Sequence, residues 1–360
     1  MASTSSESSA SSRTLHLVFN STDKVCGFLA AATSELSGSG NRQTIVAIDD
    51  PSSSTDIGKL REHAVLVLVK NGKANFKFWN FYRACCREIA AHPPSTLHLH
   101  GITSYVIGLL ALKKSSVKSK IVYSALDSCS ITTLPLSHGR RSSAARSLML
   151  PVKAAANATV PPEPWGSTYL VGIPVDEAFL NCPRDEATSP TILSGGVDAD
   201  RRTVDNLSQI AVLLSAEELK IGFEWLGEAS AAMTECFQAA SVRIVDVGDR
   251  LVHAHQLSKG WIYVVPRKTT GYPLSLIQAL AAGLPSVVLD CPQHRYVIEH
   301  GRTGFLCASE EEMVRTIAQL IDDSVLRHRV GRNARASARA RFESSAFRHK
   351  LLNCYAVSHV

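Results

Sequence analysis

Short apolar runs recur along this chain, and stretches long enough for helices separate them. The runs are nearly continuous rather than alternating with polar residues, which is typical of strands covered on both faces, as in parallel sheets. Because parallel strands need a crossover connection, usually a helix, the alternation predicts βαβ units. Strands are expected at residues 15–19, 44–48, 64–69, 96–100 and 120–124, and again at 168–173, 191–193, 221–226, 242–245, 261–265 and 286–289.

The two series of runs predict two domains, each Rossmann-like and doubly wound, in a chain of 360 residues. A linker is expected near residues 160–168, because Pro161, Pro162 and Pro164 exclude regular helix. A ligand would bind in the cleft that the two domains face, at the C-terminal ends of the strands. The expected organisation is a Ser-rich disordered tail at 1–12, a first domain at 13–160, a second domain at 168–340 and a C-terminal helix at 341–360.

Positive charge is concentrated in the first half of the chain. Residues 1–165 hold 18 Lys and Arg against 10 Asp and Glu, whereas the remainder holds 20 against 22. A basic surface attracts anionic lipid, nucleic acid or a phosphorylated substrate, and a merely solvated surface is the equal alternative. Residues 332–342 are rich in Arg but lack interleaved aromatic residues, so we expect a solvated helix face and no nucleic-acid partner.

The cysteines and the termini bear on the compartment. There are nine cysteines with no C-x-x-C pair, and the adjacent Cys85 and Cys86 suit neither a routine disulfide nor a zinc knuckle. We therefore expect a reduced, cytoplasmic chain without a structural metal. No apolar run reaches the roughly 18 residues of a membrane span, and the N-terminus lacks the apolar core of a secretory signal. Peripheral contact with the inner face of a membrane stays open.

The segment 261–307 is the most informative one. A strand leads into a loop, and Pro273 and Gly283 suit the start and the position just past the end of a helix at 273–282. That helix is apolar apart from Ser275 and Gln278, which share one face. Its free N–H groups beside a Gly-containing loop would suit a diphosphate, although a buried helix with no ligand has the same pattern.

This segment resembles the signature of family 4 glycosyltransferases, which are retaining enzymes with the GT-B fold. Weaker similarities occur in the same order at residues 97–101, 120–124, 172–176 and 192–196, so the resemblance spans roughly residues 14–340. The residues that match the signature itself are Pro266, Gly271, Pro273, Leu274, Ala279, Ala281, Gly283, Pro285 and Val287.

The resemblance implies transfer of a hexose, with retained configuration, from a nucleotide-sugar to a glycan or lipid-linked acceptor, in surface polysaccharide biosynthesis. It implies no cofactor and no metal, because helix N–H groups and a cation hold the diphosphate. Catalytic roles would fall to His100, Thr270 and Gln278. The implied donor-binding residues are Gly195, Gly196, Arg201, Arg202, Lys268, Gly271, Tyr272, Pro273 and Leu274.

The departures from the family pattern fall on the chemistry. The family's two glutamates, spaced E-x7-E, match Thr270 and Gln278, and its first-domain His-Gly matches Leu126 and Asp127. The Gly-Arg position reads Gly195-Gly196, so one diphosphate cation is missing. Lys268 can supply charge from the loop, or it is an ordinary solvated lysine. A catalytically inactive GT-B subunit or scaffold is the alternative function, and a nucleotide-sugar epimerase is a third.

His100 ends the strand at 96–100. The resemblance implies that it faces the cleft, and a satisfied histidine at a strand end is the other interpretation.

Overall fold

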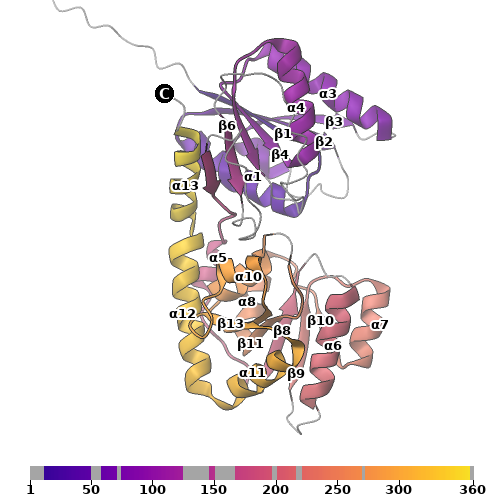
Figure 1. The fold of residues 1–360 in the computed structure, drawn as a ribbon, viewed down its shortest axis with the longest axis vertical. Coiled ribbons are helices and arrows are strands. Elements are labelled where there is room, and N and C mark those ends of the chain that lie inside the picture. The colour runs from indigo at the N-terminus through magenta and orange to yellow at the C-terminus, as the bar shows by residue number, and fades with distance from the viewer. Residues whose placement is uncertain are drawn as a thin grey trace, which may run out of the picture. The chain divides into compact units, whose positions relative to one another are not determined.

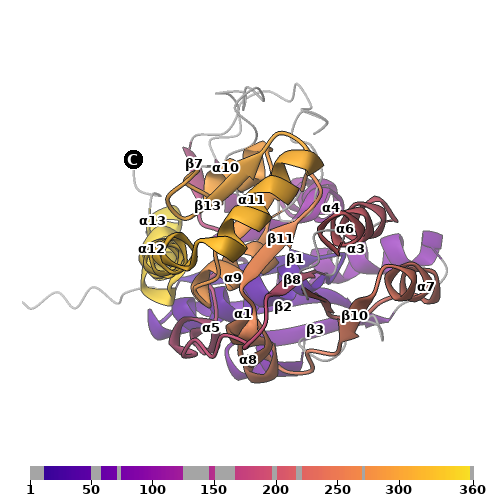
Figure 2. The ribbon, with the colours of Figure 1, turned by 90° about the horizontal axis from the view of Figure 1, so that it is seen from below.

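The structure is a computed structural model that describes residues 12–49, 58–70, 74–124, 146–150, 167–196, 201–215, 221–269 and 272–356. The chain divides into two compact units. The first unit is Met1–Ile173 with Arg348–Val360, and the second is Pro174–Phe347. Each unit is built on one parallel sheet with helices on its faces, which confirms the predicted fold class of two Rossmann-like α/β domains (Figures 1 and 2).

The first unit has a seven-stranded sheet in the order β3-β2-β1-β4-β5-β6-β7, with all neighbouring strands parallel. Chain order reverses between β1 and β4, so the C-terminal ends of these two strands form the switch point of the sheet. The strands are β1 (Arg13–Val18), β2 (Arg42–Asp49), β3 (Val65–Lys70), β4 (Thr96–His100), β5 (Lys120–Ser124), β6 (Arg146–Leu150) and β7 (Ser167–Leu170). The helices are α1 (Asp23–Gly38), the short 3-10 helix η2 (Gly58–Glu62), α3 (Ala74–Ala91) and α4 (Gly101–Ser115).

The boundary between the units differs from the predicted one. The strand expected to open the second domain at 168–173 is β7, which pairs with β6 in the first sheet. The first unit therefore runs to Ile173 rather than to residue 160. The last residues of the chain, from Arg348, return to the first unit, and residues 1–11 of the predicted tail lie outside the described residues.

The second unit has a six-stranded parallel sheet in the order β10-β9-β8-β11-β12-β13, the order of a doubly wound nucleotide-binding domain. Its switch point lies between β8 and β11. The strands are β8 (Thr191–Gly195), β9 (Gly222–Leu226), β10 (Val242–Val245), β11 (Ile262–Val265), β12 (Ser286–Leu289) and β13 (Gly304–Cys307). The helices are α5 (Glu177–Asn181), α6 (Arg201–Ser215), α7 (Ala231–Ala239), α8 (Arg250–Lys259), α9 (Leu274–Ala281), α10 (Pro292–Val297), α11 (Glu310–Asp322) and α12 (Ser324–Phe342).

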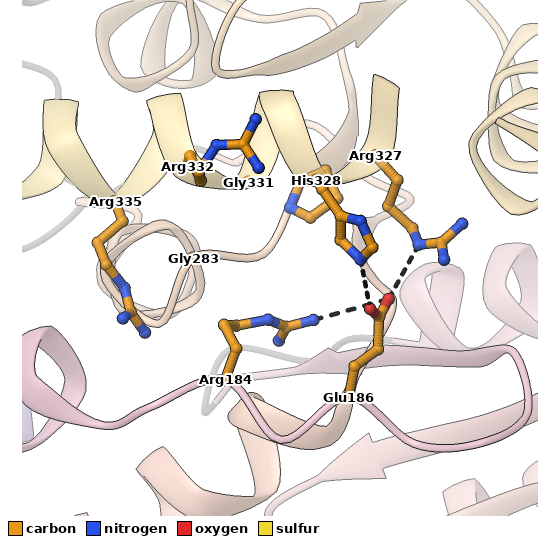
Figure 3. Close-up of a pocket in the computed structure, with 9 residues that line it drawn as sticks. Arg184, Glu186, Gly283, Arg327, His328, Gly331, Arg332 and Arg335 are labelled. Atoms are coloured by element: carbon orange, nitrogen blue, oxygen red, sulfur yellow. Dashed lines mark hydrogen bonds and ion pairs between the residues drawn. The ribbon is translucent and has the colours of Figure 1, made fainter. Parts of the chain in front are cut away.

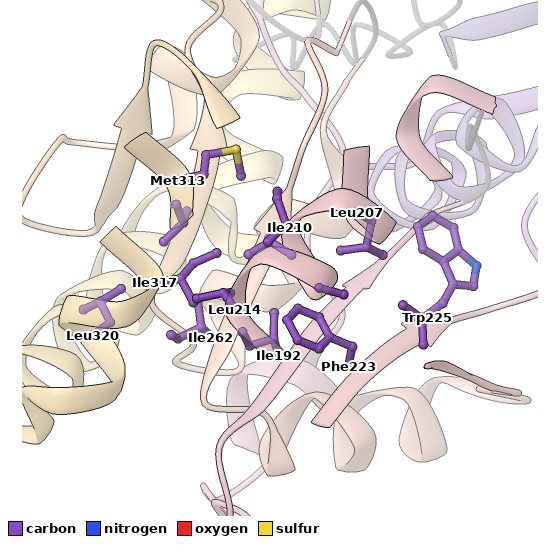
Figure 4. Close-up of a cluster of buried hydrophobic side chains, with 14 of the residues drawn as sticks. Ile192, Leu207, Ile210, Leu214, Phe223, Trp225, Ile262, Met313, Ile317 and Leu320 are labelled. Carbon is purple, nitrogen blue, oxygen red and sulfur yellow. The ribbon is translucent and has the colours of Figure 1, made fainter. Parts of the chain in front are cut away.

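A continuous apolar core joins α6 and α11 to this sheet (Figure 4). Ile192 of β8 and Ile262 of β11 are at most 1% exposed and pack side by side. Leu207 and Ile210 of α6 cover them, and Ile317 of α11 completes the layer. Burying side chains of this size contributes about 1.5–3 kcal/mol each, so this core holds β8 and β11 against α6 and α11.

The Arg-rich helix α12 was predicted to expose a solvated face, and the prediction was wrong for Arg335 and Arg341. Arg335 donates hydrogen bonds to the carbonyls of Ala281 and Ala282 at the end of α9, at 3.1 and 2.8 Å. Arg341 donates to the carbonyls that end α10, with Val297 O at 3.1 Å. Terminal carbonyls lack partners within their own helix and carry the negative end of its dipole, so arginines from α12 cap these helices.

Where α12 meets the loop after α5, a cavity of about 310 Å³ is lined by four arginines and one carboxylate (Figure 3). The Glu186 carboxylate lies 2.9 Å from the guanidinium of Arg327 and 2.7 Å from the imidazole of His328. The guanidinium of Arg184 lies 3.9 Å from the same carboxylate. Arg327 also donates to two carbonyls that end α11. Burial raises the pKa of Glu186, but the hydrogen bonds of His328 and Arg327 outweigh it and hold the pKa below the usual value. The charges of Arg184, Glu186 and Arg327 are therefore paired within the unit.

The predicted C-terminal helix is α13 (Ser344–Ala356), which starts after a break at Glu343. Among the described residues, no helix combines the length and the apolarity that a bilayer crossing requires.

Candidate functional site

The switch point of the second sheet brings two loops together. Gly195 ends β8 and Gly196 follows it, while residues 266–273 connect β11 to α9. In open α/β sheets, ligands bind outside the carboxyl ends of the strands at this point. The donor-binding residues predicted from the sequence fall largely on these two loops.

The N-terminus of α9 has two N–H groups available to an anion. The N–H of Leu274 is bound to the carbonyl of Tyr272 at 2.9 Å, and Ile277 donates to Pro273 at 3.1 Å. The N–H groups of Ser275 and Leu276 have no acceptor among the residues that the structure describes. Because the helix dipole adds positive potential at this end, these two groups suit a phosphate oxygen.

Gly196 lies against the first turn of α9. Its φ of +133° is one that L side chains rarely adopt, and a Cβ built there would lie 3.3 Å from Ser275 Oγ. The hydroxyl of Tyr263 donates to the carbonyl of Gly195 at 3.0 Å and also bonds Ser275. Burial raises the pKa of Tyr263 to about 12, so this hydroxyl stays protonated and fixes the end of β8 beside α9.

The loop after β11 is anchored on both sides of its charged residues. Asn206 Nδ2 donates to the carbonyl of Pro266 at 2.8 Å. Thr269 is buried, and its hydroxyl lies 3.0 Å from His294 Nε2, while His294 Nδ1 donates to Leu289 O at 2.6 Å. Burial lowers the pKa of His294 to about 4, so its Nε2 is a neutral acceptor for the Thr269 hydroxyl. The backbone that carries the intervening cations is therefore fixed.

Those cations are Arg267 and Lys268. Arg267 is half-buried, and its positive charge lies near enough to the Tyr263 hydroxyl and to His294 to lower the pKa of each. Lys268 is exposed. The pKa of Asp290 is lowered mainly by its hydrogen bond with Arg295. The charge of Lys268 lowers it further by a smaller amount. The sequence indicated Lys268 and missed Arg267, although both follow Pro266 directly.

Four of the other predicted site residues lie away from these contacts or outside the described residues. Arg201 and Arg202 are exposed in the first turn of α6, and Arg201 pairs with Asp205 of the same helix at 3.8 Å. Thr270 and Gly271 lie outside the described residues.

On α9 itself, Leu274 and Gln278 are half-buried, and the Gln278 side chain makes no hydrogen bond with the described part of the chain. Pro273 and Tyr272 are buried, and the Tyr272 side chain is only 1% exposed. The Tyr272 side chain therefore cannot contact a ligand in this conformation. The backbone of Tyr272 could still make such a contact.

In the first unit, His100 ends β4 as expected, but its side chain is only 2% exposed. His100 Nε2 lies 3.3 Å from Nδ1 of His16 on β1, and the ring stacks beside His98 with centroids 4.1 Å apart. Burial, reinforced by the neighbouring His16, holds the pKa of His100 well below its usual value. The histidine faces other histidines in the structure, and a catalytic role for it stays a prediction.

A segment of the second unit is similar in sequence to known glycosyltransferases. Residues 248–337 match the family model described as "Glycosyl transferases group 1". A segment of 68 residues is 43% identical to an uncharacterized glycosyltransferase of Haemophilus influenzae, and this match spans 18% of the chain and only 19% of that relative. The segment that is similar to this family lies in the second unit, begins just before α8 and includes the whole β11–α9 connection.

Solved structures share the fold over nearly the whole chain. A glycosyltransferase from Rickettsia africae superposes with a TM-score of 0.75 at 13% identity, covering 96% of this chain and 98% of that one. Anabaena Alr3699/HepE, solved in complex with UDP and glucose, gives 0.75 at 13% identity, covering 96% and 100%. At such identities the likeness establishes the fold, which is that of GT-B glycosyltransferases.

Proposed function

We propose that this protein is a glycosyltransferase that binds a nucleotide diphosphate sugar at the switch point of its second unit. The observation that carries the proposal is the convergence of the Ser275 and Leu276 N–H groups, Gly196 and Arg267 within or beside the segment that matches the glycosyltransferase family. Two N–H groups and one guanidinium can take the charge of a diphosphate without a metal ion.

The finer proposals concern the reaction. The family 4 resemblance supports a hexosyl donor, retention of configuration and an acceptor that is a glycan or a lipid-linked glycan of a surface polysaccharide. HepE, a protein of the same fold, was solved with UDP and glucose, which makes UDP-glucose the first donor to test. A cytoplasmic location would give access to that donor.

A catalytically inactive scaffold is the second candidate, and residue chemistry supports it. Thr270 and Gln278 occupy positions where the resembling family has glutamates, so neither supplies a negative charge. Donor binding with release of UDP supports the enzyme, whereas donor binding without turnover supports the scaffold. Calorimetry with UDP and UDP-glucose, followed by an assay for released UDP with candidate acceptors, separates the two. Failure to bind any nucleotide sugar would refute both.

Gln278→Glu tests whether the eroded position still faces the donor. We expect nucleotide affinity to hold or rise and turnover not to collapse, because a carboxylate accepts a ribose hydroxyl better than an amide does. The Gln278 amide is half-buried and makes no hydrogen bond within the described part of the chain, which leaves room for this exchange. The measurements are the melting temperature with and without UDP, and the rate of UDP release.

Gln209→Glu is the matched control, because Gln209 is exposed on α6. If Gln278→Glu alone melts early and UDP does not restore its stability, Gln278 belongs to the core and the preserved donor site is wrong. Burying a carboxylate without partners would account for that result.

For the acceptor side, we propose peripheral contact of the first unit with anionic membranes. α3 exposes Phe76, Phe78 and Trp79, at 66%, 40% and 55%. Lys77 lies among them, with its Nζ 5.2 Å from the ring centroid of Phe19. Exposed aromatic residues with adjacent cations fit the interface of an anionic bilayer.

Trp79→Ser should therefore weaken co-sedimentation with phosphatidylserine liposomes severalfold, and added salt should weaken wild-type binding because it screens exposed charges over about 10 Å at 0.1 M. Val212→Ser serves as the control, since Val212 is 60% exposed on the second unit. Equal sedimentation of all three proteins would rule out α3 as the contact.

A further inference from the structure

Three buried histidines gather on one face of the first sheet. His16 of β1 lies directly opposite His98 of β4, and His100 follows two residues later on the same face. None of the three is more than 2% exposed. One ring nitrogen of each residue lies within 4.8 Å of the others. From this cluster we propose that the first unit binds a divalent transition metal ion, of which Zn²⁺ is the best candidate, through His16, His98 and His100.

The hydrogen bonds of Gln43 fix the tautomer of His16. Gln43 Nε2 donates to the carbonyl of Thr33 at 2.7 Å, so its Oε1 faces His16 Nε2, 3.3 Å away, as an acceptor. His16 Nε2 therefore carries the proton, and in the neutral ring Nδ1 presents its lone pair toward His100. Metal-binding histidines are commonly oriented in this way, by donating the other N–H to an oxygen.

His98 has an orienting partner on each ring nitrogen. Its Nδ1 lies 2.6 Å from the hydroxyl of Tyr355 on α13, and its Nε2 lies 2.6 Å from Ser124 Oγ. Hydroxyls can donate or accept, so His98 can offer a lone pair through one nitrogen while the other keeps its partner. Ser124, Tyr355 or water can complete the coordination shell.

The distances suit an ion. Two nitrogens bound to tetrahedral Zn²⁺ at about 2.0–2.1 Å are about 3.3 Å apart, which is the separation of His16 Nδ1 and His100 Nε2. The remaining nitrogen pairs exceed that value by at most about 1.5 Å, a shift that a ring rotation supplies.

Hydrogen bonding alone leaves the cluster incomplete. If His100 Nε2 donates to His16, the buried Nδ1 of His100 has no partner among the residues that the structure describes. Buried polar nitrogens are rarely orphaned, and each one calls for an explanation. Phe28 packs against His98 and His100, which makes the site closed and suited to a structural ion.

This histidine site belongs to the first unit and is independent of the proposed donor site in the second unit. The absence of C-x-x-C pairs does not exclude it, because its ligands are histidines. The test uses the full-length chain, stripped with a chelator and then titrated with Co²⁺ and Zn²⁺. We expect one equivalent per chain, the intense visible bands of tetrahedral Co²⁺, and a rise in melting temperature of several degrees at a hundred times the Kd.

His16→Gln and His100→Gln should abolish the bands and the stoichiometric ion, while His92→Gln, which alters an exposed histidine of the same unit, should keep both. If either variant fails to fold, the Co²⁺ spectrum of the wild-type protein is the deciding measurement. A spectrum of tetrahedral Co²⁺ with imidazole ligands supports the site, and any other spectrum contradicts it. A wild-type protein that takes up no ion, or folded variants that bind as the wild type does, would overturn the proposal.

Discussion

Replacing Arg327 with methionine should lower the free energy of unfolding of the second unit by about 3 kcal/mol. Arg327 is 4% exposed, and its guanidinium lies 3.8 Å from the ring centroid of Trp261. It donates to Glu186 and to the carbonyls of Leu320 and Ile321. Methionine keeps the apolar stem but leaves these acceptors without their donor. Removing one partner of a buried pair costs about 3–5 kcal/mol, and the lower value applies because the Glu186 side chain is 20% exposed.

Scanning calorimetry would record the change as a fall of roughly 10 °C in the transition of the second unit. Arg329→Met is the matched control, because Arg329 is exposed on the same helix and its loss should move the transition by less than about 2 °C. Similar melting temperatures for the two variants would mean that the Arg327 contacts contribute no stability.

The architecture could be predicted because it depends on local apolar runs. The expected strands at 96–100, 120–124, 242–245 and 286–289 coincide with β4, β5, β10 and β12. Three of these strands, β4, β5 and β12, lie inside covered parallel sheets, where burial on both faces imposes a nearly continuous apolar sequence. β6 reads RSLML amid Ser and Arg, and its pairing with β5 and β7 depends on segments far along the chain. The boundary at Ile173 was missed for the same reason.

The arginines of α12 show a second limit of local sequence patterns. Their spacing is that of a polar helix face, and nothing nearby in the chain indicates that the ends of α9 and α10 lie within reach. The donor loop is similar. The sequence indicated the glycines and the N-terminus of α9. The hydrogen bonds that anchor the loop, however, join Asn206 to Pro266 and Thr269 to His294, which are 60 and 25 residues apart in the sequence. Pairings of that kind are set by tertiary structure.

Arg267→Ala should weaken the binding of UDP and UDP-glucose by roughly 10- to 100-fold. A charge-assisted hydrogen bond contributes about 1.5–3 kcal/mol, and each 1.4 kcal/mol is a factor of ten in affinity. The family's diphosphate arginine is absent at Gly196, so we expect Arg267 to compensate a larger share of the diphosphate charge. Because Thr269 and Pro266 are clamped, the loop should keep its conformation when the side chain is removed. Calorimetric titration of the purified variant measures the loss.

Two further alanine variants show whether the effect is local. Arg243→Ala removes the same charge from the edge strand β10, where the side chain is 69% exposed, and it should leave the affinity within about twofold. Lys268→Ala tests the cation that the sequence indicated, and we expect a smaller loss than for Arg267 because Lys268 is exposed and well screened. A folded Arg267→Ala protein that binds UDP as tightly as Arg243→Ala does would show that the diphosphate is held elsewhere. In that case the exposed pair Arg201 and Arg202, at the start of α6 beyond the other loop of the switch point, would be the next cations to replace.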